Sequence, residues 1–476
     1  MYSLFTHSKK KDTGYLLVLV LVFASIFLFI VSSFVGYVVT QNQVINFRFE
    51  QQRATEIAEA GLNYYKWFLA HYPGDFTNGT GLPGPYVEVY KDPEGANIGE
   101  FSLEVASSTY CGSVASVDVT STAFTYDDPS AVAVVSARYT RPTVAAYSFI
   151  TNSGVWYGAG GSVFGPLHSN QGIRMDAAHN SIIGSGQADW VCDGSYGCNP
   201  NQTVDGVHTT SGNATPGLFQ FPVSPIDFAG ITLDLAEMKT RAQNNGGIYI
   251  PPTSQAGYRV IFNGDGTVDI RVVTGTRNYV SYDAIQGWHW GERNVITASS
   301  LIPGGNNIVI DPACPLLFIE DKVWLEGDID MKVTVAAANL TSVNETNIVI
   351  NDDIQYVPGT NAGLLAIAED DVDINLVIPG EDLELQGIFI AQNGRYGRNA
   401  YSEVNLPNDL RPFAYLGDLN RLGTVVSFER AAVNWIGNSG FTGGSSSFDR
   451  NQVDDPPPLT PQTSDVYEFE DWRQEG

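Results

Sequence analysis

The sequence has little positive charge and few charges of either sign. It contains 25 Lys and Arg residues against 52 Asp and Glu residues, which gives a formal net charge of −27 and a pI near 4.4. A strongly acidic surface repels phosphate groups. The composition therefore argues against nucleic acid and anionic lipid headgroups as partners of the soluble part. The simplest role of the excess negative charge is to keep the protein soluble.

The sequence also lacks the motifs that carry the commonest kinds of catalysis. It contains no nucleophile elbow, no phosphate-binding loop and no metal-spaced histidine pair. His168, Arg174 and Asp176 are the best candidates for an acid–base set, in a segment that fits a polysaccharide-cleaving β-helix. A lone histidine among turn residues is more often a hydrogen-bonded corner. We therefore predict no enzyme activity, no cofactor and no metal site.

Three acidic stretches have a simpler explanation than metal binding. Asp352-Asp353 and Asp370-Asp371 are typical of solvated turns, because acidic residues are common throughout this chain. Gly264-Asp265-Gly266 lies within YRVIFNGDGTVDIRVV, which predicts a β-hairpin with the turn residues such a connection needs. It does not fit a calcium loop, since the EF-hand spacing requires glycine where Val268 stands.

Charge is entirely missing from one long stretch near the N-terminus. No charged residue interrupts the chain from Gly14 to Phe47, whereas a secretory signal needs only about 7–15 apolar residues. A run of this length crosses a hydrocarbon core of about 30 Å as a helix. The lysines Lys9–Lys11 precede the run, so we expect the N-terminus in the cytoplasm and the remainder outside.

The helical pattern continues beyond the apolar run. In RFEQQRATEIAEAGLNYYKWFLAHYPG, apolar residues recur at steps of three and four, the spacing of one helix face. Pro73-Gly74 then predicts the end of the helix. A continuous helix from Tyr15 to His71 is roughly 85 Å long. The predicted face consists of Ala58, Gly61, Leu62, Tyr65, Phe68, Leu69 and Tyr72.

These N-terminal features resemble a type IV pilin-like protein. The resemblance is carried by a short basic leader that ends in Gly14, the apolar helix that follows, and AEAGLNYYKWFL on its extension. It covers about the first 75 residues and is greatest to minor pilins of the PilX type and to the large pseudopilin of type II secretion systems. An uncleaved membrane anchor with a basic N-terminus is the alternative explanation.

The resemblance implies processing, partners and a location. A prepilin peptidase would cut after Gly14 and leave Tyr15 as the first mature residue. The partners would be other pilin subunits and the pilus assembly machinery of the inner membrane. The protein would wait in that membrane through its N-terminal helix, with its C-terminal region outside, and then move to an extracellular pilus at the cell surface.

Two positions depart from the family pattern. Most pilins begin the mature chain with Phe and carry Glu as the fifth residue, whereas this sequence has Tyr15 and Leu19 there. A carboxylate in hydrocarbon is kept only where it finds a partner, which in the family is the N-terminal amine of the next subunit. Leu19 cannot make that contact, so we expect the subunit at the tip or in the initiation complex of its filament.

Cysteine is scarce, and an exported chain permits disulfides. Cys192 and Cys198 lie in VCDGSYGCNP, a turn sequence that predicts a disulfide closing a small loop. With no third thiolate or nearby histidine, they make a poor zinc set. Cys111 and Cys314 either pair across domains or stay free, and the sequence does not choose between these alternatives.

The region after the helix is predicted to be mostly β, which makes the whole chain α+β. FSLEVASS, VASVDVTSTAFTY and AVAVVSARYTR alternate as antiparallel strands with one buried face, and they resemble the sheet that packs on a pilin helix. FAGITLDLAEMKTRAQNNGGIYI predicts the only convincing second helix, at about Leu233 to Gln243. The expected domains are a leader (1–14), the pilin helix (15–73), a β-sheet domain (80–150), a β-rich head (151–450, with an insertion at 218–300) and a Pro-rich acidic tail (451–476).

A weak repeat indicates how the head is built. NIVI occurs at Asn307 and again at Asn347, amid short apolar runs separated by Asp, Asn, Gly and Pro. Such spacing favours a β-solenoid with coils of about 20 residues, although a β-sandwich fits nearly as well. GSVFGPLHSNQGIRMD (161–176) fits an earlier coil of the same stack.

Two functions of different classes fit the sequence. The first is a non-enzymatic minor pilin of a type IV pilus or related secretion filament, with an extracellular head that binds an unknown surface ligand. The second is a surface-anchored protein that binds or cleaves carbohydrate and has no part in a filament. Neighbouring genes for a prepilin peptidase and small pilins would favour the first.

Overall fold

The computed structural model describes residues 13–229, 234–284, 286–341, 346–435, 437, 439–464 and 466–475. The chain divides into two compact units. The helix–sheet unit contains the described residues up to Ala106, together with Asp118–Ala137 and the end of the chain from Trp472. The head unit contains Ser107–Val117 and Arg138–Asp471. One long helix followed by mostly β structure confirms the predicted α+β, mostly β, class.

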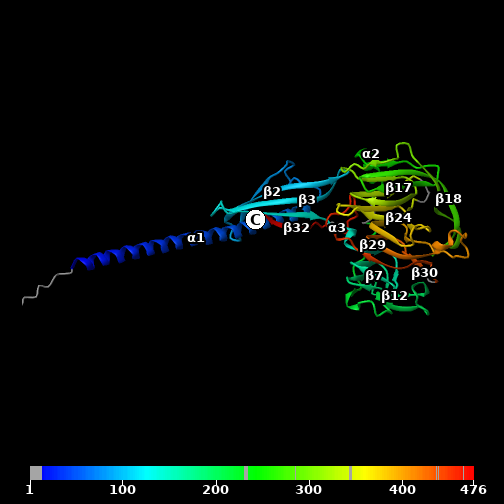
Figure 1. Ribbon diagram of the computed structural model, residues 1–476, viewed down its shortest axis with the longest axis horizontal. Helices are drawn as coiled ribbons and strands as arrows, with labels where there is room; N and C mark the ends of the chain where they lie inside the picture. Colours follow the sequence, from blue (N-terminus) through cyan, green and yellow to red (C-terminus); the bar gives the residue numbers. More distant parts are fainter. Residues whose placement is uncertain are drawn as a thin grey trace, which may run out of the picture. The chain divides into compact units, whose positions relative to one another are not determined.

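The helix–sheet unit is built on α1 (Thr13–His71), the long dark-blue helix in Figure 1. One face of its C-terminal half is buried, with the spacing of three and four that the sequence predicts. Tyr72 is an error of that prediction. Because the helix ends at His71, Tyr72 leaves the periodic face and is 56% exposed. The buried residues are Ala54, Ile57, Ala58, Gly61, Leu62, Tyr65, Phe68 and Leu69.

A five-stranded sheet, in the order β1-β2-β3-β4-β32, lies against this helix. Its strands alternate between buried and partly exposed residues, as expected for a sheet with one covered face. The connection from β2 to β3 consists of Cys111 and Gly112, both with positive φ, as a two-residue hairpin turn requires. The strands are β1 (Tyr86–Lys91), β2 (Asn97–Tyr110), β3 (Ser113–Thr125), β4 (Val132–Thr140) and β32 (Glu468–Glu475).

Two glycines allow the helix and the sheet to come close together. A Cβ atom on Gly61 of α1 would lie 2.5 Å from Ser121 Oγ and 2.8 Å from the ring of Phe101. A Cβ atom on Gly99 of β2 would lie 2.7 Å from Ile57 Cδ1. Side chains at either position would therefore push α1 off the sheet.

The head unit contains parallel strands stacked one on another, seen edge to edge in Figure 1. This parallel stack differs from an antiparallel β-sandwich, because each strand pairs with strands that run in the same direction. Its longest face has ten strands. In spatial order they are β16 (Ile248–Ile250), β21 (Leu316–Ile319), β23 (Lys332–Ala337), β25 (Gly363–Ala368), β27 (Leu383–Ala391), β29 (Tyr415–Ser427), β5 (Phe149–Thr151), β8 (Leu167–Ser169), β11 (Ile183–Ser185) and β15 (Phe219–Gln220).

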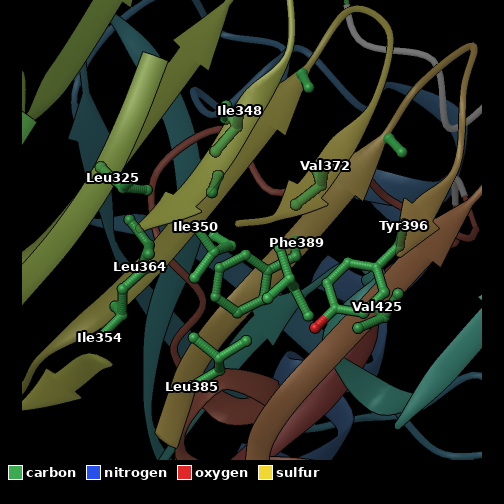
Figure 2. Packing of buried hydrophobic residues seen from close by; sticks show 14 of the residues in the cluster. Leu325, Ile348, Ile350, Ile354, Leu364, Val372, Leu385, Phe389, Tyr396 and Val425 are labelled. Carbon is green, nitrogen blue, oxygen red and sulfur yellow. The ribbon is translucent and has the colours of Figure 1, made fainter. Parts of the chain in front are cut away.

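The register of this face is continuous and places apolar residues above one another. An inward ladder runs through all ten strands, and its members belong to or pack on one hydrophobic core. Figure 2 shows Leu364, Phe389 and Val425 converging in that interior. In strand order the ladder is Ile248, Leu317, Val335, Ala366, Phe389, Val425, Phe149, Leu167, Ile183 and Phe219.

The outer side of the same face is also apolar and covered. Alternate residues such as Phe318, Ile367 and Ile390 belong to a second core cluster with Phe228 and Met238, which lie outside the stack. Strands β21, β23 and β25 are consequently buried at every position. Burial on both sides explains why the sequences of β21 and β25 read as unbroken apolar runs rather than as alternating patterns.

The remaining strands of the stack form its other sides. Two ladders of parallel strands flank the ten-strand face, and a separate three-stranded parallel sheet completes the first coils. One ladder contains β17 (Gly257–Asn263), β22 (Val323–Ile329), β24 (Ile348–Tyr356), β26 (Val372–Ile374) and β28 (Tyr396–Gly397). The other strands are β31 (Ser439–Ser447), β7 (Gly161–Phe164) and β10 (Ala178–His179), and in the small sheet β6 (Val155–Tyr157), β9 (Ile173–Met175) and β14 (Val207–His208).

Coils do not stack in the order of the sequence. GSVFGPLHSNQGIRMD does form coil strands, as predicted. Its strand β7 pairs with the C-terminal strand β31, and its strand β8 pairs with β5, which itself pairs with the C-terminal strand β29. The chain then returns to the far end of the stack, where the 248–263 coil lies. The two ends of the ten-strand face lie nine strand spacings apart, which amounts to about 43 Å. Residues 221–247, which include α2 (Leu235–Asn244), connect these ends. Phe228 and Met238 of this segment provide the cover on the outer side of the face.

The two NIVI segments are not structural repeats, which corrects the sequence analysis. Ile348 and Val349 open β24 within the parallel stack, whereas Ile308 and Val309 form β20, which pairs antiparallel with β18. Their similarity reflects shared β propensity and not shared position. The predicted hairpin at Gly264–Gly266 is confirmed, with β17 antiparallel to β18.

The antiparallel additions and short helices complete the head unit. The longest addition is the hairpin of β18 (Thr267–Asp283) and β19 (Gly287–Leu301), and β18 runs along one side of the stack in Figure 1. The predicted second helix is α2, and α3 is a further helix that the sequence analysis missed. The two helices are α2 (Leu235–Asn244) and α3 (Arg450–Asp454). The remaining strands are β12 (Asp189–Cys192), β13 (Gln202–Asp205), β20 (Ile308–Val309) and β30 (Asn434–Trp435). The 3₁₀ turns are η1 (Val144–Ala146), η2 (Gly194–Tyr196), η3 (Pro216–Leu218) and η4 (Arg411–Ala414).

Candidate functional site

The N-terminal half of α1 is the largest apolar surface that the described chain leaves uncovered. Its most apolar window has a mean hydropathy of 2.9, and none of that window is buried within the protein. Tyr15 is 79% exposed, and Leu19 is 44% exposed. A helix this apolar on all sides is stable only in a hydrocarbon environment or against other helices. Gly14 lies within the helix, while Lys9–Lys11 lie outside the described residues.

A polar junction marks where the helix passes from uncovered to covered. The hydroxyl of Thr125, the last residue of β3, donates to Glu50 Oε2 at 2.6 Å and so joins β3 to the helix. Arg53 lies 3.3 Å from Glu50 and 3.2 Å from Asp127. Thr125 is fully buried, so its hydroxyl depends on this carboxylate for a hydrogen-bond partner. The junction fixes where sheet contact begins along α1.

His168, Arg174 and Asp176 do not form an acid–base set. The His168 Nε2 atom bonds Asn170 Oδ1 at 2.9 Å, whereas Arg174 Nε donates to Asp176 Oδ2 at 2.8 Å. Burial lowers the pKa of His168. Among the described residues no hydrogen bond or ion pair joins His168 to Asp176. His168 bonds within its own turn, while Arg174 and Asp176 bond neighbouring segments, so all three have the structural role that the sequence analysis favoured.

The Asp176 carboxylate is held in its charged form. Burial alone would raise its pKa, but the Thr210 N–H, Trp156 Nε1 and Arg174 together hold the pKa of this carboxyl below its usual range. The same arginine is also occupied on its other atoms, donating to Tyr196 O at 2.7 Å. A carboxylate fully engaged in this way is a structural anchor rather than a proton donor.

In the structure, Cys192 and Cys198 form a disulfide that closes the loop containing η2. Both cysteines are buried. Two cations hold the loop at Tyr196, since Arg174 donates to its carbonyl oxygen and the Arg430 guanidinium lies 4.0 Å from its ring centre. The loop is therefore attached to the stack by non-covalent contacts as well as closed covalently.

Cys111 and Cys314 are also bonded to each other, within the head unit. Cys111 lies at the β2–β3 turn, and its N–H donates to Ala313 O at 3.0 Å. Its carbonyl oxygen accepts from Arg241 Nη1 at 2.8 Å and from Asn245 Nδ2 at 3.2 Å, both near the end of α2. The bond thus attaches the turn to the end of the parallel stack that α2 covers.

The acidic pairs are half-buried rather than solvated, which corrects their sequence-based interpretation. Asp353 Oδ1 accepts from the Glu384 N–H at 2.9 Å, and Asp371 Oδ1 accepts from the Arg395 N–H at 2.7 Å. Each carboxylate therefore caps a backbone donor of the next coil. Burial raises the pKa of Asp352 and of Asp370. Over the described ranges, no group of three metal-ligating side chains is close enough to hold an ion.

One buried polar cluster was not singled out from the sequence. Glu292 of β19 accepts hydrogen bonds from the Tyr279 and Tyr401 hydroxyls at 3.0 and 2.6 Å and from Asn399 at 2.8 Å. Arg398 is completely buried beside it, with its guanidinium 4.7 Å from the Tyr401 ring. Burial lowers the pKa of Arg398. These contacts hold the β18–β19 hairpin on the stack.

A depression of about 680 Å³ lies in the head unit beside α2. Asp227, Asp234 and Glu237 line it, together with Arg241 and the Leu459–Ser464 segment. The Arg241 guanidinium pairs with Glu237 and donates to the Cys111 carbonyl oxygen, so it is already occupied. Its lining includes no histidine or cysteine. The depression therefore has no arrangement that points to catalysis.

Comparison with known proteins adds one structural similarity. No protein-family model matches the sequence, and no characterised protein matches it. Among solved structures, the chain is similar to the competence-associated pilin ComZ from Thermus thermophilus, with 12% sequence identity over 90% of this chain and 97% of that chain. The TM-score is 0.29.

Proposed function

We propose that this chain is a non-enzymatic, pilin-like structural subunit of a type IV pilus or related secretion filament. One observation carries the proposal: a single helix, α1, has an uncovered apolar first half and a second half packed on a β-sheet. The first half suits a membrane before assembly and a bundle of like helices afterwards. The second half supports a large exported head.

We propose the inner membrane as the site of insertion, with Lys9–Lys11 in the cytoplasm and the head outside. A prepilin peptidase would cleave after Gly14, and Tyr15 would become the first residue of the mature subunit. Other pilins and the assembly machinery of the inner membrane would be its partners. The basic stretch and the apolar run support this order of events.

Within the filament, we propose a place at the tip or in the initiation complex. The head unit of about 345 residues has a radius of gyration near 20 Å by the usual size scaling, which makes close stacking of many copies difficult. Leu19 supports the same placement. If Glu at the fifth mature position attracts the amine of the subunit already in place, the first subunit to enter has no such neighbour and can lose the carboxylate without cost.

Immunogold labelling of sheared filaments with antibodies against the head tests this placement. The proposal requires gold at one end of the filament and fewer filaments after deletion of the gene. An antibody against an abundant subunit of the same filament provides the control, because it should label the whole shaft. Gold spaced along the shaft with the head antibody would refute tip placement.

A further inference from the structure

The outer face of the β18–β19 hairpin tip carries the two most exposed tryptophans of the head unit. Trp288 is 51% exposed, and Trp290 is 64% exposed. Tyr282 of β18 lies directly opposite Trp288, and Val280 lies opposite Trp290. Directly paired residues of an antiparallel hairpin project to the same side. These residues therefore form one continuous surface, which we call the aromatic face.

A β-bulge at Gly291 separates this face from the buried polar cluster. In a regular strand Trp290 and Glu292 would project to the same side. The pairing instead shifts at this point, since Tyr279 lies opposite Glu292 while Val280 lies opposite Trp290, and Gly291 has a φ of +130°. The extra residue turns Glu292 toward the stack and leaves Trp290 facing out.

The four residues of the aromatic face carry no charge, although the chain as a whole has a net charge of −27. The charged neighbour on the outer side is Arg293, whose Nε donates to Asn278 Oδ1 at 2.7 Å. Asp283, the acidic residue of this part of β18, lies 3.2 Å from His289, and both side chains are largely buried on the inner side. The bulge places Glu292 there as well. An anionic ligand would be repelled by the acidic chain, and a cationic ligand would find no carboxylate on this face.

The ring of Tyr282 is held in place before any ligand arrives. Tyr282 exchanges two backbone hydrogen bonds of 2.9 Å with Ala400 of the stack. Its ring lies 5.5 Å from Trp288 and 5.4 Å from Trp435, the latter edge-on at 87°. The Trp435 indole is fixed in turn, because its Nε1 donates to Arg398 O at 2.7 Å. Little conformational freedom of Tyr282 is therefore lost on binding.

We propose that the aromatic face binds a neutral polysaccharide. The C–H faces of pyranose rings are apolar and stack on exposed indole and phenol rings, while the sugar hydroxyls stay in water. A neutral glycan thus matches a surface of uncharged aromatic residues on an acidic protein. This binding does not depend on membership of a filament, so it can fail or hold separately from the proposed function.

Titration of the full chain with neutral oligosaccharides tests the proposal. The protein is kept in a zwitterionic detergent, because detergents with sugar headgroups would compete. Gluco-, manno- and N-acetylglucosamine oligomers are followed by calorimetry and by tryptophan fluorescence. We expect at least one series to bind, and Trp288→Ala and Trp290→Ala each to lower the association constant about ten-fold.

Trp472→Ala is the matched control, since Trp472 is 49% exposed but lies on β32 in the helix–sheet unit. It should change the association constant less than about two-fold. Unchanged near-ultraviolet circular dichroism would show that the hairpin variants remain folded. Binding of none of the oligomers, or binding that survives loss of both hairpin tryptophans, overturns the proposal. Tryptophan-dependent self-association without sugar binding would instead assign the face to contacts between copies.

Discussion

The two halves of helix α1 have similar secondary structure and opposite surroundings. In the first half, residues such as Leu28 and Phe29 are 66% and 75% exposed. In the second half, Leu62 and Leu69 are at most 1% exposed, on a face that covers the five-stranded sheet. The described part of the chain therefore provides a partner for only one half of this helix.

The difference between the halves lies in their glycines as well as in their apolar residues. Gly61 faces Ser121 and Phe101 at distances that leave no room for a side chain, while a Cβ atom on Gly36 would meet nothing within 4 Å. The second half is thus fitted to a surface that belongs to the same chain. The first half awaits a surface that the described chain does not contain, such as lipid or another subunit.

The largest expected effect is at Leu62. Leu62→Ala should lower the free energy of unfolding of the helix–sheet unit by about 2–5 kcal/mol, because it leaves a cavity beneath the helix. Amide hydrogen exchange of β2 and β3 in detergent-solubilised protein would measure this loss. Leu28→Ala is the matched control and should change the protection by less than about 0.5 kcal/mol. Equal effects at the two positions would abolish the distinction between the halves.

A smaller effect is expected from added volume. Gly61→Val should destabilise the same unit by about 1–3 kcal/mol, because its side chain would push against Ser121 and Phe101. Gly36→Val should leave the unfolding temperature of the unit unchanged. If Gly61→Val were tolerated as well as Gly36→Val, the close helix–sheet approach would be wrong.

The smallest effect should come from the junction between the halves. Glu50→Ala leaves the buried Thr125 hydroxyl without its acceptor and should cost about 1 kcal/mol. Thermal unfolding of the variant would show this loss, and the double variant with Thr125→Val should recover part of it. Additive losses in the double variant would contradict a direct interaction between these side chains.

Features set by local chemistry were predictable from the sequence. The spacing of Ala58, Leu62 and Leu69 predicts the buried face of α1, and Gly264–Gly266 predicts the turn between β17 and β18. Both depend on residues close together in the chain. Tyr72 shows the limit of periodicity. The apolar pattern includes Tyr72, but the helix already ends at His71, two residues before Pro73.

Features set by distant pairing were not predictable. Nothing near Phe149 indicates that it lies beside Val425, so the order of the coils in the stack has no local signal. The same holds for Glu292 and Arg398, since charged residues are usually exposed and their types carry no sign of burial. The aromatic face depends on a bulge whose only trace in the sequence is Gly291.

The N-terminus of the protein recovered from sheared surface filaments shows whether the chain is a processed, pilin-like subunit. Mass spectrometry of that fraction should find a mature chain that begins at Tyr15, and Gly14→Val should leave the full-length protein in the inner membrane. Both results are expected of a processed, pilin-like subunit. Recovery only from the membrane fraction, with Met1 or Tyr2 as the first residue in wild-type cells, would contradict it.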